Sequence, residues 1–578
     1  MELHDFRHTS ETTLNCDVCI VGTGPAGLAI ASELSAAACN VLLLESGDLR
    51  QSPEVTALNR VENVGAPRLG FEDSARVRIR GFGGTTAVWN GRCVPLSPLD
   101  FTERSWVALS GWPITYAQLQ PYFERAARYL GLLPVAYDGT LEPSLPTQLP
   151  GLPEALAQDI TRCCWQFSVD QANPSVAKQS AQAFLARRRE HDHVRVLLQA
   201  TATHIEVDGN AQLQWLEIRS LTGRSARVHC KLVVLCAGGV ETPRLLLQSR
   251  STMKRGLGNQ HDMLGRCFMD HPRCTVGHFD LAGGPRLRPP FMLQRVDAEG
   301  RARYFIRGLE LTPHCQRREQ LLNCAGWIDA RVAPDDPWGA IKRLARRHSP
   351  KPITDVSHVL SQPRLTVREL YRRFVERRPV LYKTDALTLL ADVEQMPNLD
   401  SRLSLSEQRD ALGVPLARID WRFGAAERRT LQRFGQLAQR AFASMGLPEL
   451  HLSESVRTGQ FQASDFVDVA HPAGGARMAS DPRRGVVNEY GQVHGVRGVF
   501  VAGTSVFPTN GHANPTLTLV ALAVRLADHI KAVYVKPAVA GPAPQAPRLP
   551  TSGDLPRAAV LPSAELSPVS SVTFRTQL

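Results

Sequence analysis

Residues 18–34 read VCIVGTGPAGLAIASEL, and this stretch decides the fold. Its first four residues are apolar, as in a buried parallel strand, and the small and apolar residues after the last glycine predict a helix. A second apolar strand is predicted at residues 41–44. Strand, glycine-rich turn, helix and second strand together predict the compact βαβ unit of a dinucleotide site.

The three glycines of the turn have separate tasks. Gly22 permits a tight turn, Gly24 lets the backbone approach a pyrophosphate, and Gly27 lets the helix pack close to the strand. The phosphates would then lie at the helix N-terminus, where unpaired N–H groups favour negative charge. Glu45 follows the second strand and can accept hydrogen bonds from ribose hydroxyls. This pattern does not separate NAD from FAD.

A second glycine-rich loop reads GGTTAVWNGR at residues 83–92. Gly83 and Gly84 would let the backbone lie flat against a ligand. The hydroxyl and amide groups that follow, including those of Thr85 and Asn90, could reach phosphate or ring edges. A purely structural loop is the alternative interpretation.

Two segments near the C-terminus carry further polar residues. Residues 471–478 read HPAGGARM, and residues 499–518 read VFVAGTSVFPTNGHANPTLT. The apolar start of the second segment predicts a strand that ends at Gly503. Asn514 precedes a predicted helix, so it would lie at the positive end of that helix.

These segments resemble the glucose-methanol-choline (GMC) oxidoreductases, which are FAD enzymes. The resemblance runs from Cys16 to Ile530 and includes ordered matches at residues 110–113 (SGWP), 233–247 and 269–272 (MDHP). It implies an α/β fold, α+β overall, in which a Rossmann-like FAD-binding domain is interleaved with a mixed-sheet substrate-binding domain. Trp89 and the Asn-Pro-Thr sequence at residues 514–516 look closest to the pyranose oxidase-like branch.

The resemblance also implies how FAD is held. A His that can tether the flavin covalently in that branch is replaced here by Val88, which implies non-covalent FAD. Many relatives carry an Asp where this chain has Thr504, so backbone N–H groups would serve the flavin there. The implied cofactor-binding residues are Gly22, Gly24, Gly27, Glu45, Gly83, Gly84, Thr85, Trp89, Asn90, Gly503, Pro515 and Thr516.

The family places a catalytic His at the position of His471 and its partner at the position of Asn514. A neutral imidazole is a suitable acceptor for the hydroxyl proton of an alcohol, and the amide can donate to the same oxygen as negative charge develops. His512 is the rival base, and we interpret His271 as structural. Arg477 could neutralise a phosphate or pair with an acid.

No metal site is predicted. Cys16 and Cys19 form a Cys-x-x-Cys pattern inside a strand, and strand alternation predicts that their side chains point to opposite faces.

The predicted domain organisation is interleaved along the chain. It consists of an N-terminal extension (1–14), three parts of the FAD-binding domain (15–150, 191–282 and 471–535), two parts of the substrate-binding domain (151–190 and 283–470) and a disordered Pro/Ala/Ser-rich tail (536–578).

The chain has 67 Lys and Arg against 55 Asp and Glu, a formal charge of +12. The basic residues gather at 187–189, 317–318, 342–347 and 372–378, which are typical of solvated helix faces. Weak docking on a membrane surface or a partner subunit is the alternative. No nucleic-acid-binding pattern and no membrane span accompany the charge. The polar residues 1–15 and the scattered cysteines predict a cytoplasmic location, or a periplasmic one only if the chain is exported together with a partner.

The predicted function is FAD-dependent oxidation of an alcohol, with a sugar or polyol as substrate. A dehydrogenase is favoured over an oxidase, and the electron acceptor, whether quinone, cytochrome or O₂, is left open. Three alternatives remain: oxidation of a steroid or another apolar alcohol, a lyase that keeps FAD without redox chemistry, and a non-catalytic flavoprotein subunit.

Overall fold

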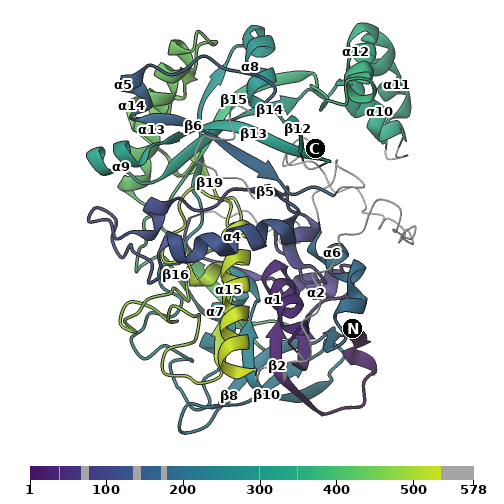
Figure 1. Cartoon of the computed structure of the whole chain (residues 1–578), viewed down its shortest axis with the longest axis vertical. Helices are drawn as coiled ribbons and strands as arrows, with labels where there is room; N and C mark the ends of the chain where they lie inside the picture. The colour runs from purple at the N-terminus through teal and green to yellow at the C-terminus, as the bar shows by residue number, and fades with distance from the viewer. Residues whose placement is uncertain are drawn as a thin grey trace, which may run out of the picture.

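A computed structural model describes residues 1–535 except 38, 67–76, 134–144, 171–178, 299, 346 and 348. Figure 1 shows two sheet-based layers, one above the other in the view, which the chain visits alternately. The predicted α/β fold, with a Rossmann-like unit interleaved with a second sheet-based unit, is confirmed. The second sheet was predicted to be mixed, but all pairings between its described strands are antiparallel. The predicted disordered tail lies outside the described residues.

The first sheet contains the βαβ unit. Its strand order is β1-β7-β3-β2-β10-β9-β8, with β20 paired to β10. Along the row β1-β7-β3-β2-β10, and between β10 and β20, neighbouring strands are parallel. The pairs β10-β9 and β9-β8 are antiparallel. The strands are β1 (Glu2–Asp5), β2 (Thr13–Val21), β3 (Val41–Leu44), β7 (Val194–Leu198), β8 (Thr201–Val207), β9 (Leu213–Arg219), β10 (Ser225–Leu235) and β20 (Val499–Val501). Residues 2–5, which the sequence assigns to an N-terminal extension, therefore form the edge strand of this sheet.

Helices from distant parts of the chain accompany this sheet, and α15 contacts both α1 and α4. They are α1 (Pro25–Ser35), α4 (Tyr116–Leu130), α6 (Ser180–Ala186), α7 (Gly238–Gln248) and α15 (Thr516–Tyr534). Local sequence sets the ends of α4: Thr115 and Gln118 form a capping box at its start, and Gly131 ends it in the left-handed conformation. The position of α1 agrees with the helix predicted after the glycine turn.

The second sheet has the order β18-β11-β15-β14-β13-β6-β5, with β12 and β19 attached. Apolar residues of one face, including Leu389 and Ala391, pack against Phe434 and Leu437 of helix α13 (Ala425–Ser444). The strands are β5 (Arg92–Cys93), β6 (Ile160–Phe167), β11 (Arg273–Phe279), β12 (Gln294–Ala298), β13 (Arg301–Leu311), β14 (Cys324–Val332), β15 (Thr384–Val393), β18 (His451–Leu452) and β19 (Phe466–Val467). The opposite face is left to contact the first layer.

Two smaller parts complete the molecule. A three-stranded sheet joins β4 (Val61–Asn63), β17 (Pro415–Asp420) and β16 (Arg402–Arg409). Three short helices, α10 (Pro337–Ala345), α11 (Pro352–Ser361) and α12 (Pro363–Phe374), stand at the outer end of the second sheet, at the upper right of Figure 1. Among the described residues, no helix is both long and apolar enough to cross a membrane.

Candidate active site

Three glycine-bearing turns meet at one edge of the first sheet. They follow β2, β10 and β20, which are parallel neighbours, so their carboxyl ends lie together. A Cβ placed at Gly24, Gly238 or Gly503 would meet no atom within 4 Å. This open cradle, at the N-termini of α1 and α7, fits a bulky anionic cofactor that approaches the bare backbone.

The other glycines of the first turn are held by close packing instead. A Cβ at Gly22 would lie 2.7 Å from the Cys236 carbonyl oxygen, and one at Gly27 would lie 2.0 Å from the Gly22 oxygen. The second glycine-rich loop lies against the same turn: the Gly83 N–H donates to the Thr23 carbonyl, and a Cβ at Gly84 would lie 2.9 Å from the Gly24 Cα. Residues more than fifty positions apart thus form one surface.

Glu45 is buried beside this turn. Its carboxylate accepts hydrogen bonds from the backbone N–H and the hydroxyl of Thr23 and from the Gly47 N–H. Glu45 therefore ties the end of β3 to the glycine turn. Carboxylate oxygens accept more than one hydrogen bond, so these contacts leave it able to receive a ribose hydroxyl as well.

The segment that contains His471 lies close to the cradle. A Cβ at Gly239, in the first turn of α7, would lie 2.1 Å from the Pro472 oxygen. The Gly474 and Ala476 N–H groups donate to carbonyls of Thr504 and Ser505, just after β20. The glycine turn and the histidine segment, far apart in sequence, are therefore joined through α7 and through the turn after β20.

His471 forms a chain of hydrogen bonds with His271. Nδ1 of His471 lies 3.0 Å from Nδ1 of His271, and Nε2 of His271 lies 3.3 Å from the carbonyl oxygen of Asn510. A carbonyl only accepts, so a neutral His271 carries its proton on Nε2 and its Nδ1 is an acceptor. Nδ1 of His471 must then carry the proton, which leaves Nε2 of His471 with a free lone pair.

The backbone around this pair is fixed by buried groups. The Asp270 carboxylate accepts from the backbone N–H groups of His271 and His471, and the Asn510 amide donates to the Asp270 carbonyl. Burial is the largest cause, and the neighbouring His271 the second, of a pKa of about 3 for His471. Neutral His471 is therefore the dominant form near pH 7, as a proton acceptor requires.

His512, the rival base, belongs to a separate network. Its Nδ1 lies 3.0 Å from Oδ1 of Asn323, whose amide nitrogen donates to Asp100. Nδ1 of His512 therefore carries the proton, and Nε2, 3.7 Å from the Glu310 carboxylate, has no hydrogen-bond partner within the described part of the chain. Burial lowers the pKa of His512 to about 4.

The remaining predicted residues lie around the cradle as follows. Asn514 is 9% exposed and stands directly before Pro515 and the first residue of α15, Thr516, at the positive end of the helix. Thr85 and Asn90 are exposed, and Asn90 accepts a hydrogen bond from the Arg92 N–H, while Trp89 is half-buried and packs on the core. These positions are compatible with roles beside a cofactor, which remain predictions.

A polar and aromatic face of the second sheet lies next to the histidines. The Trp165 ring meets His512 edge-on at 6.1 Å. The Arg92 guanidinium lies 4.2 Å from the centre of the Trp327 ring and 5.5 Å from that of Trp165. Arg92 is only 3% exposed, and its Nε has no hydrogen-bond partner among the described residues. A buried cation of this kind is available to an oxygen-rich ligand.

Sequence analysis missed several of these residues. His271 was interpreted as structural, although its side chain contacts His471, and Asn510, Arg92 and Trp165 were not singled out. The Met-Asp-His-Pro segment was the only available signal for His271. Arg477 binds the Leu109 carbonyl and the Cys267 thiol, so neither of its two predicted partners, an acid or a phosphate, appears among its described contacts.

The prediction that Cys16 and Cys19 point to opposite faces is wrong. Both thiols interact with each other and with Cys230 on β10, whose pKa is lowered by these contacts. The N–H groups of Asp17 and Val18 both donate to the Asn40 carbonyl, which marks a bulge in β2 that re-aims the side chains.

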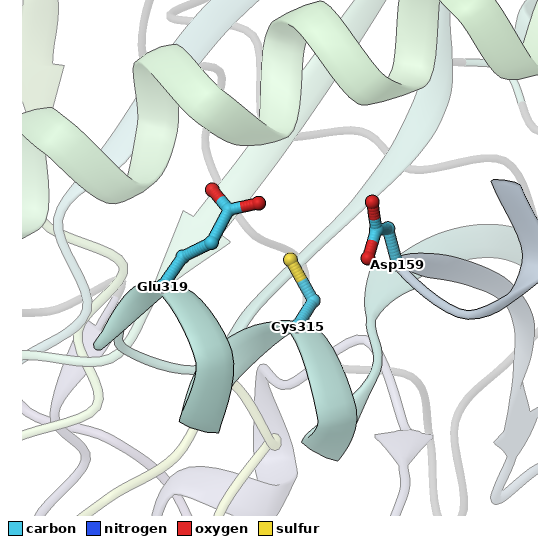
Figure 2. Close-up of side chains that lie close together, drawn as sticks. All are labelled: Asp159, Cys315 and Glu319. Carbon is cyan, nitrogen blue, oxygen red and sulfur yellow. The ribbon is translucent and has the colours of Figure 1, made fainter. Parts of the chain in front are cut away.

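One group of possible metal ligands lies elsewhere, on the second sheet. Figure 2 shows Asp159, Cys315 and Glu319 close together, the last two on helix α9 (Pro313–Glu319). Arg318 pairs with both carboxylates, and Arg433 also binds Glu319. Burial raises the pKa of Cys315 to about 11, so the thiol stays protonated near neutral pH. Two guanidinium groups already neutralise this cluster.

Known proteins share the sequence pattern over nearly the whole chain. The 6'''-hydroxyparomomycin C oxidase of Streptomyces lividus is 26% identical over 89% of this chain and 92% of its own length. The fructose dehydrogenase large subunit of Gluconobacter japonicus is 22% identical over 90% and 98%. The 2-methyl-1,2-propanediol dehydrogenase of Mycolicibacterium austroafricanum is 25% identical over 89% and 95%.

The fold also matches solved structures. A crystal structure of pyridoxine 4-oxidase superposes with a TM-score of 0.54 at 18% identity and covers 90% of this chain and 100% of that one. The family models for the N-terminal and C-terminal parts of GMC oxidoreductases match residues 21–273 and 397–523. With the glycine cradle and the histidine segment brought to one edge of the sheet, these matches show that the chain belongs to the GMC oxidoreductase family, which acts on CH–OH donors with FAD.

Proposed function

We propose that this chain oxidises an alcohol group of a sugar or polyol, with His471 as the base. The observation that carries the proposal is the hydrogen-bond chain from Asn510 through His271 to His471, which leaves an unprotonated Nε2 on His471. FAD, when bound in the glycine cradle, supplies the hydride acceptor. Nε2 of His471 accepts the hydroxyl proton, and the Asn514 amide donates to the oxygen as charge develops there.

The sheet face above the histidines supports a hydroxyl-rich substrate. Trp165 and Trp327 are buried aromatic rings on this face, and Arg92 lies beside them. Glu310, whose pKa is raised to about 8 by burial and by Asp100, adds a carboxylic acid next to His512. Buried polar groups favour ligands that can pair with them, which is the reason to prefer a sugar or polyol over a steroid.

The nature of the relatives supports the same substrate class. Those named above are an aminoglycoside oxidase, the large subunit of a fructose dehydrogenase and a diol dehydrogenase. Their names include both oxidases and dehydrogenases. We favour a dehydrogenase with a quinone or cytochrome acceptor, and non-covalent FAD because Val88 offers no nucleophile. The twelve cysteines, which form no disulfide in the described part of the chain, support a cytoplasmic location.

Anaerobic titration of the yellow protein with sugars, polyols and sterols tests the substrate class. We expect flavin bleaching with sugars or polyols and none with sterols. The reverse result would replace the substrate proposal, and no bleaching with any alcohol would favour a lyase. Steady release of hydrogen peroxide in air would identify an oxidase, and flavin that stays with the protein after acid precipitation would show covalent attachment.

A further inference from the structure

The helices α10–α12 and the turn that follows, residues 337–378 without 346 and 348, form a small group that we name the helical knob. It stands clear of the second sheet at the upper right of Figure 1. Large apolar side chains on its surface are solvent-exposed to an unusual degree: Ile353 by 87%, Leu360 by 72% and Phe374 by 69%. Val356, Val367, Tyr371 and Val375 are exposed as well. An apolar surface of this kind marks a contact site.

The exposed apolar residues follow helical spacing, so each helix presents a stripe. On α11 the stripe is Ile353, Val356 and Leu360, and on α12 it is Val367, Tyr371 and Phe374. The inward positions of the same helices are acidic. Asp355 is buried and paired with Arg343, and Glu369 is buried and accepts from the Leu381 N–H. The fully buried position of each helix is thus a carboxylate, while several large apolar side chains lie outside.

The surface around the stripes is positively charged. Residues 351–378 contain seven Lys and Arg against three Asp and Glu, and two of those acids, Asp355 and Glu369, are the buried ones. Lys351, Arg364, Arg377 and Arg378 are exposed. On α12, Arg364 precedes Val367 by one turn, so positive charge and apolar side chains share the exposed face.

We propose that the helical knob docks the protein on an anionic lipid surface. Apolar stripes flanked by Lys and Arg match the boundary between headgroups and acyl chains, where both kinds of side chain are satisfied. A second copy of the chain fits less well, because a symmetric contact would bring two positive surfaces together. The knob is also a protrusion, which enters a deformable bilayer more readily than a flat protein surface. This docking is independent of the proposed catalysis.

Sedimentation of the FAD-loaded full chain with vesicles tests the proposal. We expect binding to vesicles of phosphatidylcholine with phosphatidylglycerol, weaker binding to phosphatidylcholine alone, and a loss of affinity as salt rises. The double variant L360S/F374S should bind at least about tenfold more weakly, and K351E/R364E should lose the preference for anionic vesicles. Because both pairs are exposed, the variants should fold and bleach with substrate in solution like the unaltered protein.

The matched control is L49S/L281S, two leucines outside the knob that are each 50% exposed. It should bind vesicles as well as the unaltered protein does. The proposal is overturned if anionic vesicles bind no protein at low salt, or if the knob and control variants bind equally. A concentration-dependent dimer in sedimentation velocity that L360S/F374S abolishes would assign the knob to self-association instead.

Discussion

At the scale of single residues, the direction of one hydrogen-bond chain decides which nitrogen can act. Because the Asn510 carbonyl must accept from His271, the proton positions follow along the chain to His471. His471→Ala should leave a folded, yellow protein whose flavin is reduced by substrate at least about a hundredfold more slowly. Stopped-flow absorbance under anaerobic conditions measures this rate.

His512→Ala is the matched control for that experiment. His512 also has an unprotonated Nε2, but it lies against Glu310 rather than in the His271 chain. We expect a smaller loss than for His471→Ala. If His512→Ala abolishes reduction and His471→Ala leaves it unchanged, the base has been assigned to the wrong histidine.

His271 acts through His471 and is a positioning residue, so its effect should appear in the pH profile. Burial and His271 hold the pKa of His471 near 3, and the rate of reduction falls as pH falls through this pKa, because a protonated imidazole accepts no proton. The acid limb of the unaltered enzyme should therefore lie well below pH 6.5. His271→Ala should slow reduction about tenfold and move the limb to higher pH, because one cause of the lowered pKa is removed.

His271→Gln provides the contrast to that variant. A glutamine oxygen can accept from Nδ1 of His471, and its amide can donate to the Asn510 carbonyl, so part of the rate should return. Because the imidazole of His271 is absent in this variant too, the acid limb of the pH profile should still move to higher pH. Equal slowing in both variants with an unmoved pH profile would show that His271 only fills space.

At the scale of elements, local sequence predicts what local structure decides. The glycine turn with α1 and the strand at 499–501 both appear where the sequence pattern predicts them. The contact between His271 and His471 spans two hundred positions and depends on how the chain returns to the same sheet edge. No local pattern carries that information, and this is why the sequence identified His471 only through a family resemblance and did not connect it with His271.

The bulge in β2 shows the same limit on a smaller scale. Alternation along an ideal strand placed Cys16 and Cys19 on opposite faces, but two successive N–H groups share the Asn40 carbonyl and break the alternation. A bulge depends on the partner strand, so the sequence of β2 alone does not contain it. Predictions of side-chain direction in a strand are therefore weaker than predictions of the strand itself.

Two glycines of the first turn provide a paired test of the cradle. Gly24 has φ −65° and open space at its Cβ position, so Gly24→Ala should leave the melting temperature of the apoprotein unchanged while FAD binds at least about tenfold more weakly. Gly27→Ala would place a Cβ 2.0 Å from the Gly22 oxygen, so it should lower the melting temperature with or without FAD. Fluorescence quenching and thermal unfolding measure the two effects. Unaltered FAD affinity in Gly24→Ala would mean that the cofactor does not approach this turn.

At the scale of the whole molecule, the proposed site needs both layers. The first sheet supplies the cradle, and the segment that carries His471 is hydrogen-bonded to the turn after its strand β20. The second sheet supplies the face with Arg92, Trp165 and Trp327. The chain crosses between the layers several times, so each layer is built from segments far apart in sequence. We propose that this arrangement separates cofactor binding from substrate binding, so substitutions on the second face should change substrate binding without changing FAD binding.

Arg92 offers the sharpest test of that separation. Burial and Arg273 lower the pKa of its guanidinium to about 10, so it is still charged near pH 7, and its Nε lacks a hydrogen-bond partner in the described part of the chain.

Arg92→Met should lower kcat/KM for the sugar or polyol substrate about 10- to 100-fold, because a hydrogen bond from a charged group contributes about 1.5–3 kcal/mol. FAD affinity should be unchanged. The melting temperature without substrate should change little, because the substitution removes both the desolvation cost of the buried cation and its attraction to Asp392 and Asp329. Arg250→Met, at an exposed arginine, is the matched control and should alter none of these quantities. A lower melting temperature with unchanged kcat/KM would show instead that Arg92 serves the packing of Trp327.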